Sequence, residues 1–110
     1  LNVYDLPAIR DIGIDQAAYR AVAHLTREAL DGFFIHLDAD VLDDAIMPAV
    51  DFRIPGGLSR EDLTKVLTIA LASGKAIGLE VAIYNPKLDQ DGSAGRDLTD
   101  LLAQVLGPAT

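Results

Sequence analysis

FFIHLDADVLDD, residues 33–44, joins a run of apolar side chains to four aspartates. The apolar part is short and continuous, which is typical of a strand that is buried on both faces of a parallel sheet. Open α/β sheets place their ligands at the carboxyl ends of such strands. Asp38 and Asp40 follow the apolar run directly, so the stretch predicts a central strand with either a cation site or a solvated loop at its end.

The sequence on both sides alternates between strand and helix patterns. Two further apolar segments, residues 1–6 and 75–84, are expected as strands beside the strand at 32–37. Helices are expected over 15–30, from Ser59 to Gly74, and over 94–106, with Asp15 and Ser59 as N-caps and Gly32, Gly74 and Gly107-Pro108 as stops. Such alternation indicates βαβ units, a parallel sheet and helices on both faces. The expected fold class is therefore α/β, with three α/β/α layers and residues 1–110 as one domain.

Composition excludes several kinds of partner and compartment. Hydrophobic residues make up 50% and charged residues 24% of the chain, as in globular domains. The net charge is −8 and no basic stripe is present, which argues against nucleic acid and anionic membranes as partners. The chain has no cysteine, so it has no disulfide and no thiolate metal site, and a reducing, cytoplasmic location is expected. No apolar run of membrane-spanning length and no signal-peptide pattern is visible.

The two aspartates after the strand are the first candidates for chemistry. Residues two apart in an extended strand point the same way, so His36, Asp38 and Asp40 are expected to share one side. Two carboxylates that are aimed at one point repel each other unless a cation joins them. Hard cations such as Mg²⁺ and Mn²⁺ prefer oxygen ligands. The spacing therefore predicts a metal site, while a polar loop after a buried strand is the alternative that spacing alone leaves open.

Two families carry this local pattern. Haloacid dehalogenase-like phosphatases have D-x-D-x-T/V, with Asp38 as nucleophile and Asp40 as acid/base, but Leu42 stands where that motif has Thr or Val. HLDADVLDDAIMPAVDFRIPGGLS, residues 36–59, resembles the ureohydrolase (arginase, agmatinase, formiminoglutamase) signature S-x-D-x-D-x-x-D-P-x-x-x-P-A-x-G-x-P followed by G-G-L. The matching positions, in register without a gap, are Asp38, Asp40, Asp43, Pro48, Ala49, Gly56, Gly57 and Leu58. GLEVAIYNPKLD, residues 78–89, resembles the last strand of that family, G-L-D-x-x-E-x-N-P, and the resemblance covers nearly the whole chain.

The ureohydrolase resemblance implies a fold, a cofactor and roles for three residues. The fold would be α/β/α with a mostly parallel eight-stranded sheet, of which this chain holds the last three strand–helix units. Two Mn²⁺ ions would activate a bridging hydroxide that attacks a linear amidine or guanidine. Asp38 would bridge both ions and Asp40 would ligate one of them. Glu80 would orient a metal-bound histidine, with a structurally paired carboxylate as the alternative. The substrate would be a small molecule, and the complete protein a homo-oligomer.

Other polar residues of the motif have simpler expected roles. His36 stands where the family usually has Ser, so we expect a hydrogen-bonded structural residue there, and we expect no ligand role for His24 on its helix. Asp43 is expected to bind the backbone of its own loop, and Asp44 to be solvated. Gly56 and Gly57 are expected to meet requirements of backbone geometry.

The chain also departs from the family pattern. The family's Glu that pairs with the substrate guanidinium is Ile83 here, and a Thr at the substrate end of the signature loop is Phe52. Burying a guanidinium unpaired is costly, so ordinary arginase or agmatinase activity is not expected. A different substrate, such as a less charged amide or formimino group, or loss of activity would each account for these changes.

The remaining metal ligands of the family lie in G-G-D-H and D-A-H-x-D motifs that would precede residue 1. This chain has two histidines, and neither stands in such a motif. With a start at Leu1 and three expected strands, the sequence is interpreted as the C-terminal part of a longer protein. The isolated chain is expected to be inactive, and no catalytic residue is assigned. The alternative is a noncatalytic domain that serves oligomerisation or interaction.

Overall fold

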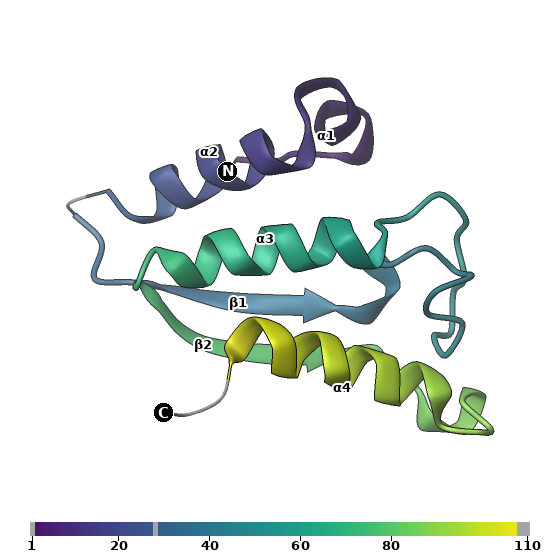
Figure 1. Ribbon diagram of the computed structural model, residues 1–110. Helices are drawn as coiled ribbons and strands as arrows, with labels where there is room; N and C mark the ends of the chain where they lie inside the picture. The colour runs from purple at the N-terminus through teal and green to yellow at the C-terminus, as the bar shows by residue number, and fades with distance from the viewer. Residues whose placement is uncertain (1, 28, 108–110) are drawn as a thin grey trace.

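The computed structural model describes residues 2–27 and 29–107, and leaves the expected strand residue Leu1 and the expected helix stop Pro108 outside. Its helices and strands are α1 (Leu6–Ile12), α2 (Ile14–Leu25), β1 (Phe33–Asp38), α3 (Arg60–Ala72), β2 (Ala76–Ala82) and α4 (Ser93–Leu106) (Figure 1). Two short 3₁₀ turns, η1 (Ala39–Val41) and η2 (Pro86–Leu88), follow the two strands. The order of these elements places a turn or loop at the end of each strand.

The two strands form a parallel pair. His36 lies opposite Glu80, and Asp38 lies opposite Ala82, the last residue of β2. Both strands therefore end at the same edge of the sheet, and α3 makes the crossover between them. The expected α/β class is confirmed, as a partial sheet with its connecting helices.

The strand expected over residues 1–6 is wrong. Leu6 already begins α1, because the Asp5 carboxylate accepts the Ala8 N–H at 3.0 Å as an N-cap, with Pro7 in the first turn. A capping aspartate followed by proline is a strong helix start, and no strand partner offsets it. Within the described residues the chain thus forms two strands where the sequence predicts three.

The helix expected over 15–30 is shorter than predicted and begins one residue earlier. It starts at Ile14 after Gly13, whose positive φ of 90° ends α1 and separates it from α2. Asp15 therefore lies in the first turn and is not the N-cap. The helix ends at Leu25, where the Thr26 hydroxyl donates to the Val22 carbonyl at 2.8 Å, well before Gly32.

The start of α3 confirms the Ser59 prediction. The Ser59 hydroxyl accepts the Asp62 N–H at 3.0 Å, and the Asp62 carboxylate accepts the Ser59 N–H at 3.2 Å. This reciprocal capping box fixes the point at which the loop after β1 becomes a helix. No helix in residues 2–27 and 29–107 has the length and apolar character needed to cross a membrane.

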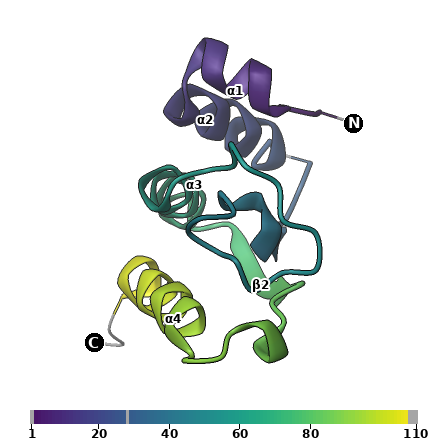
Figure 2. The same ribbon diagram turned by 90° about the vertical axis from the view of Figure 1, so that its right-hand side faces the viewer.

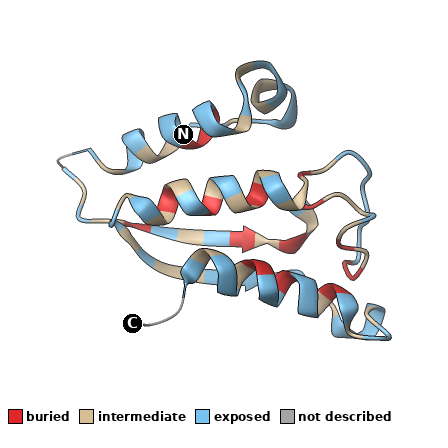
Figure 3. Cartoon of the chain, viewed as in Figure 1, coloured by how far each residue is buried: buried red, intermediate tan, exposed pale blue. Residues whose placement is uncertain are grey.

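The core lies between one face of the sheet and the helices α3 and α4. The core includes residues of β1, of the loop after it, of α3 and of α4: Leu37, Leu42, Met47, Leu63, Leu67, Leu98 and Leu101. Figure 2 shows α3 and α4 on one side of the strands, and Figure 3 shows buried residues on these helices and at the end of β1. Phe34, with 57% of its surface exposed, marks the opposite face, where its ring lies over Gly78.

Candidate metal centre

Asp38 and Asp40 lie together where β1 ends. Asp38 is the last residue of the strand, and the chain turns at once into η1. The Asp38 carboxylate accepts the Asp40 N–H at 3.0 Å. The sequence analysis assumed that the extended strand continues to Asp40. It ends at Asp38, and a tight turn brings the two acids together instead.

The two carboxyl groups carry charge that the surrounding residues do not balance. A hydrogen bond with Asp38, partial burial and the negative charge of Asp38 raise the pKa of the Asp40 carboxyl above its ordinary value. In the part of the chain that the structure describes, none of the ion pairs includes Asp38 or Asp40. An acid pair in this condition would gain from a bound cation.

Asp43, farther along the same loop, is in the opposite situation. Its carboxylate accepts the Ala45 N–H at 3.0 Å and the Gly56 N–H at 2.7 Å. These backbone donors hold the pKa of the Asp43 carboxyl below its ordinary value. The structure confirms the expectation that Asp43 binds the backbone of its loop, and it shows that this bond spans from residue 43 to residue 56.

Asp44 differs from its expected role. Its carboxylate lies 3.5 Å from the Arg53 guanidinium, and its side chain is 28% exposed. The expectation of a merely solvated side chain is wrong, because the loop folds back and brings Arg53 to Asp44.

The glycines of the loop have the backbone roles that were expected. Gly56 has a positive φ of 87°, which is unfavourable for other residues. A Cβ on Gly57 would lie 2.7–2.8 Å from backbone atoms of Val41, Leu42 and Asp43. The second half of the loop therefore packs directly against the segment that follows the acid pair.

His36 and Glu80 contact each other across the two strands. Nδ1 of His36 lies 2.5 Å from Oε1 of Glu80, and both side chains are 57% exposed. His36 is hydrogen-bonded, as expected of a structural histidine. His24 lies on α2, with its Nε2 2.9 Å from Nη1 of Arg27. Among the residues that the structure describes, no three His, Cys, Asp or Glu side chains form a group that could hold a metal ion.

The loop after β2 carries contacts that the sequence reasoning missed. The Tyr84 hydroxyl donates to Asp89 at 2.7 Å, and Asp89 accepts the N–H groups of Ala94 and Gly95 at the start of α4. An aspartate a few residues before a Gly-Ser helix start was a usable signal for this cap. The pKa of the Asp89 carboxyl is lowered, first by the Tyr84 hydroxyl and then by the backbone donors.

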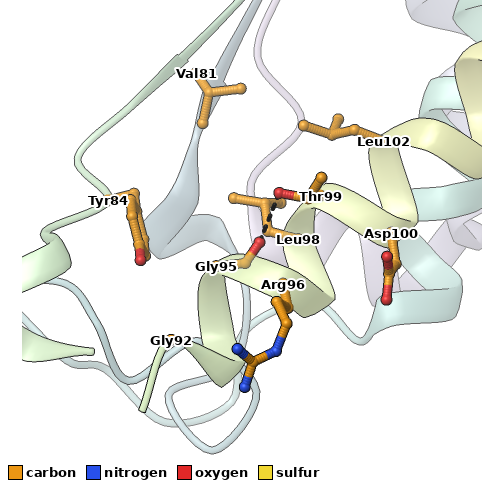
Figure 4. A pocket seen from close by; sticks show the side chains of 9 residues that line it. All are labelled: Val81, Tyr84, Gly92, Gly95, Arg96, Leu98, Thr99, Asp100 and Leu102. Carbon is orange, nitrogen blue, oxygen red and sulfur yellow. Dashed lines mark hydrogen bonds between the residues drawn. The ribbon is translucent and has the colours of Figure 1, made fainter. Parts of the chain in front are cut away.

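An open hollow of about 530 Å³ lies between the end of β2 and α4. Figure 4 shows Tyr84 and Val81 on one side, and Leu98, Thr99 and Leu102 of α4 on the other. The lining residues do not include Asp38 or Asp40. This hollow is therefore separate from the acid pair.

Comparisons with known proteins agree with these observations. The model of the Arginase family matches residues 1–107. The arginase of Brucella melitensis is 32% identical over 106 residues, which cover 96% of this chain and 34% of that protein. The formimidoylglutamase of Aeromonas hydrophila is 33% identical over 76 residues, which cover 69% of this chain and 24% of that protein.

The fold is similar to solved arginase structures as well. A crystal structure of arginase from Bacillus subtilis superposes with a TM-score of 0.87 at 26% identity, over 99% of this chain and 37% of that chain. This chain spans about a third of the length of the relatives that it matches. An acid pair at the carboxyl edge of a parallel sheet and a family match along nearly the whole sequence lead to one conclusion: the chain belongs to the arginase family.

Proposed function

We propose that this chain supplies the Asp38–Asp40 part of a two-Mn²⁺ site in a hydrolase that acts on a linear C–N bond of the amidine or guanidine type. The observation that carries the proposal is the unbalanced acid pair, whose mutual contact raises the pKa of Asp40 at the carboxyl end of β1. Family membership supports a hydrolase of this kind. Because the chain spans about a third of its relatives, the activity is proposed for a protein that also contains the rest of the site.

The donor set suits a hard cation. Both groups are carboxylates, and carboxylate, carbonyl and water oxygens are the ligands that suit Mn²⁺. The described residues hold no group of three ligands, so further ligands are proposed to come from beyond them. Bound Mn²⁺ would make water nucleophilic at neutral pH. In this proposal Asp38 and Asp40 would hold the metal ions, while Asp43 and Gly57 hold the loop that presents the two acids.

The proposal extends to Glu80. Its carboxylate already lies against an imidazole, that of His36, and could in the same way hold the ring of a histidine that binds metal. We also propose a small-molecule substrate, a cytoplasmic location and a homo-oligomeric protein, with residues 1–110 as the C-terminal part of one α/β domain.

One observation favours a second candidate function. Phe34 and Ile77 are 57% and 75% exposed, which is unusual for large apolar side chains on a sheet. A noncatalytic interaction or oligomerisation domain would use such surface. Mass in solution that rises with concentration, without any requirement for metal, would favour this function.

The direct test is calorimetric titration of the 110-residue chain with Mn²⁺, carried to millimolar concentration because a partial site binds weakly. We expect binding that falls about tenfold or more in Asp38→Asn, since removing a ligand costs at least as much as removing a residue that supports one. Asp44→Asn is the matched control, because Asp44 lies in the same loop but is paired with Arg53. Equal affinity in Asp38→Asn and the wild type would contradict the proposal.

A further inference from the structure

Arg10, in the last turn of α1, contacts two parts of the structure around the acid pair at once. Its Nη1 lies 3.1 Å from Oδ2 of Asp62, and its Nη2 donates to the Gly57 carbonyl at 3.4 Å. Asp62 belongs to the capping box that starts α3, and Gly57 lies near the end of the loop that leads into it. One guanidinium can serve both acceptors because its N–H groups form a rigid fork.

Apolar packing does not hold α1 against this loop. None of the residues of α1 is buried. A hollow of about 200 Å³ lies between α1 and the loop, and its lining includes Leu6, Ile9, Val41 and Leu58. The polar contacts of Arg10 therefore join α1 to the loop where the packing is open.

The turn that carries Asp40 is bonded directly to Leu58, the residue after Gly57. The Leu58 N–H donates to the Val41 carbonyl at 2.9 Å, and the Leu58 carbonyl accepts the Asp43 N–H at 2.9 Å. Val41 is the last residue of η1 and follows Asp40 directly. The guanidinium is therefore linked to the acid pair through this stretch of backbone.

The acid pair gains from such support. The two carboxylates repel each other, and a turn that is free to open would let them separate. Ligands that are free to separate must be brought together again before they bind an ion, which lowers their affinity. A loop that is held beside the turn limits this movement.

We propose that Arg10 is a positioning residue of the Asp38–Asp40 centre and keeps the 3₁₀ turn in the conformation that binds a divalent cation. This inference rests on the proposed function and adds α1 to the structure that supports the centre. Arg10 acts through the backbone of Gly57 and Leu58, and its ion pair with Asp62 holds the guanidinium in place. The Asp62 side chain is only 18% exposed, so this pair is screened less than a pair of fully exposed charges.

The sign of the expected effect separates positioning from charge. Removing Arg10 makes the chain, whose net charge is −8, more negative by one unit, and this change by itself favours Mn²⁺ binding. A loss of affinity in Arg10→Ala is opposite to the charge effect and reports lost positioning. Lys65→Ala is the matched control, because it removes the same charge and breaks an ion pair of 3.9 Å between α3 and Asp15 of α2.

The test is a Mn²⁺ titration of the 110-residue chain that follows the NMR signal of the Ala39 methyl group. Paramagnetic Mn²⁺ broadens signals near it, and Ala39 lies between the two acids. We expect Arg10→Ala to bind Mn²⁺ about fivefold more weakly than the wild type, a smaller effect than that of a residue in direct contact with a metal ligand. Lys65→Ala should bind at least as tightly as the wild type. Thermal unfolding without metal establishes that both variants are folded.

The outcomes distinguish this inference from the proposed function. Wild-type affinity in folded Arg10→Ala, or an equal loss in Lys65→Ala, would overturn the inference and leave the metal proposal intact. If Arg10→Ala does not fold, Arg10→Lys decides, since it keeps the charge but lacks the fork and should bind about twofold more weakly. Wild-type affinity in that variant would equally overturn the inference. A wild-type Ala39 signal that Mn²⁺ does not broaden would overturn the metal proposal and, with it, the role of Arg10.

Discussion

Asp40 and Asp43 stand three residues apart in one loop, yet their carboxyl groups have opposite surroundings. Asp38 raises the pKa of Asp40, whereas the backbone N–H groups of Ala45 and Gly56 lower the pKa of Asp43. A carboxylate that backbone donors surround is already stabilised by the fold. The Asp40 carboxyl meets the Asp38 carboxyl instead and remains suited to a cation. The direction of the pKa shift therefore distinguishes acids that hold the loop in place, such as Asp43, from acids that could bind a cation, such as Asp40.

The loop after β2 repeats the structural half of this pattern. Asp89 accepts the Tyr84 hydroxyl and two backbone N–H groups, and its pKa is lowered like that of Asp43. Each strand is therefore followed by an aspartate that fixes the loop, and only the loop after β1 adds an acid pair.

Gly57→Ala should have the largest effect on stability. The new Cβ would overlap backbone atoms of residues 41–43, which cannot move without disturbing the acid pair. We expect a loss of about 3 kcal/mol in the free energy of unfolding, measured by denaturant titration. Gly74→Ala is the control, since Gly74 has a positive φ of 71° but open space around it, and should cost about 1 kcal/mol. Equal losses in both variants would show that the close contact at Gly57 has no energetic weight.

Asp43→Ala should lower the melting temperature by less than Gly57→Ala, and in a pH-dependent way. The folded-state pKa of Asp43 lies below its ordinary value of 3.8, so its stabilisation is complete above that value and is lost as the pH falls through the folded pKa. The gap between wild type and variant should therefore be largest near neutral pH and close at low pH. Thermal unfolding from pH 7 to pH 2 measures it, and a gap that is constant with pH would contradict the assignment.

Asp38→Asn, unlike Asp43→Ala, should change stability only when metal is present. Without metal we expect no loss of stability, because the change removes a repulsive charge from beside Asp40. With Mn²⁺ at tenfold its dissociation constant the wild type should gain about 1.4 kcal/mol, and the variant should gain almost none. Thermal unfolding with and without Mn²⁺ gives both results. A clear loss of stability in the metal-free variant would place Asp38 among the structural acids.

Glu80→Gln should have the smallest effect on stability, within about 0.5 kcal/mol, because an exposed pair with His36 contributes little. Denaturant unfolding measures the change, and Glu61→Gln on the exposed side of α3 provides a baseline. A loss above about 1 kcal/mol would show that the His36–Glu80 contact holds the two strands together.

Local sequence signals predicted much of the fold and part of the site. The apolar run before Asp38 predicted a strand, Ser59 predicted the start of α3, and Asp43 predicted the loop contact. Each of these signals acts over a few residues or follows from one side chain with a strong preference. The family was also readable, because the signature from His36 to Ser59 is specific.

Where the sequence reasoning failed, contacts between distant residues or competing local signals decided. Residues 1–6 read as an apolar strand, but a strand requires a partner, and the Asp5-Leu6-Pro7 cap needs none. The return of Arg53 to Asp44 depends on the course of the whole loop. The sequence pattern of a short segment predicts neither the absence of the strand nor the contact between Arg53 and Asp44.

Local preference and motif spacing were enough to predict the α/β class, the family, the start of α3 and the two acids that form the pair. Tertiary structure alone decided that Asp38 and Asp40 meet through a 3₁₀ turn, that Asp43 and Asp40 have opposite pKa shifts, and that Ile83 carries a positive φ. Charge environment and backbone strain depend on which groups the fold brings within a few ångströms, and spacing along the chain does not specify this.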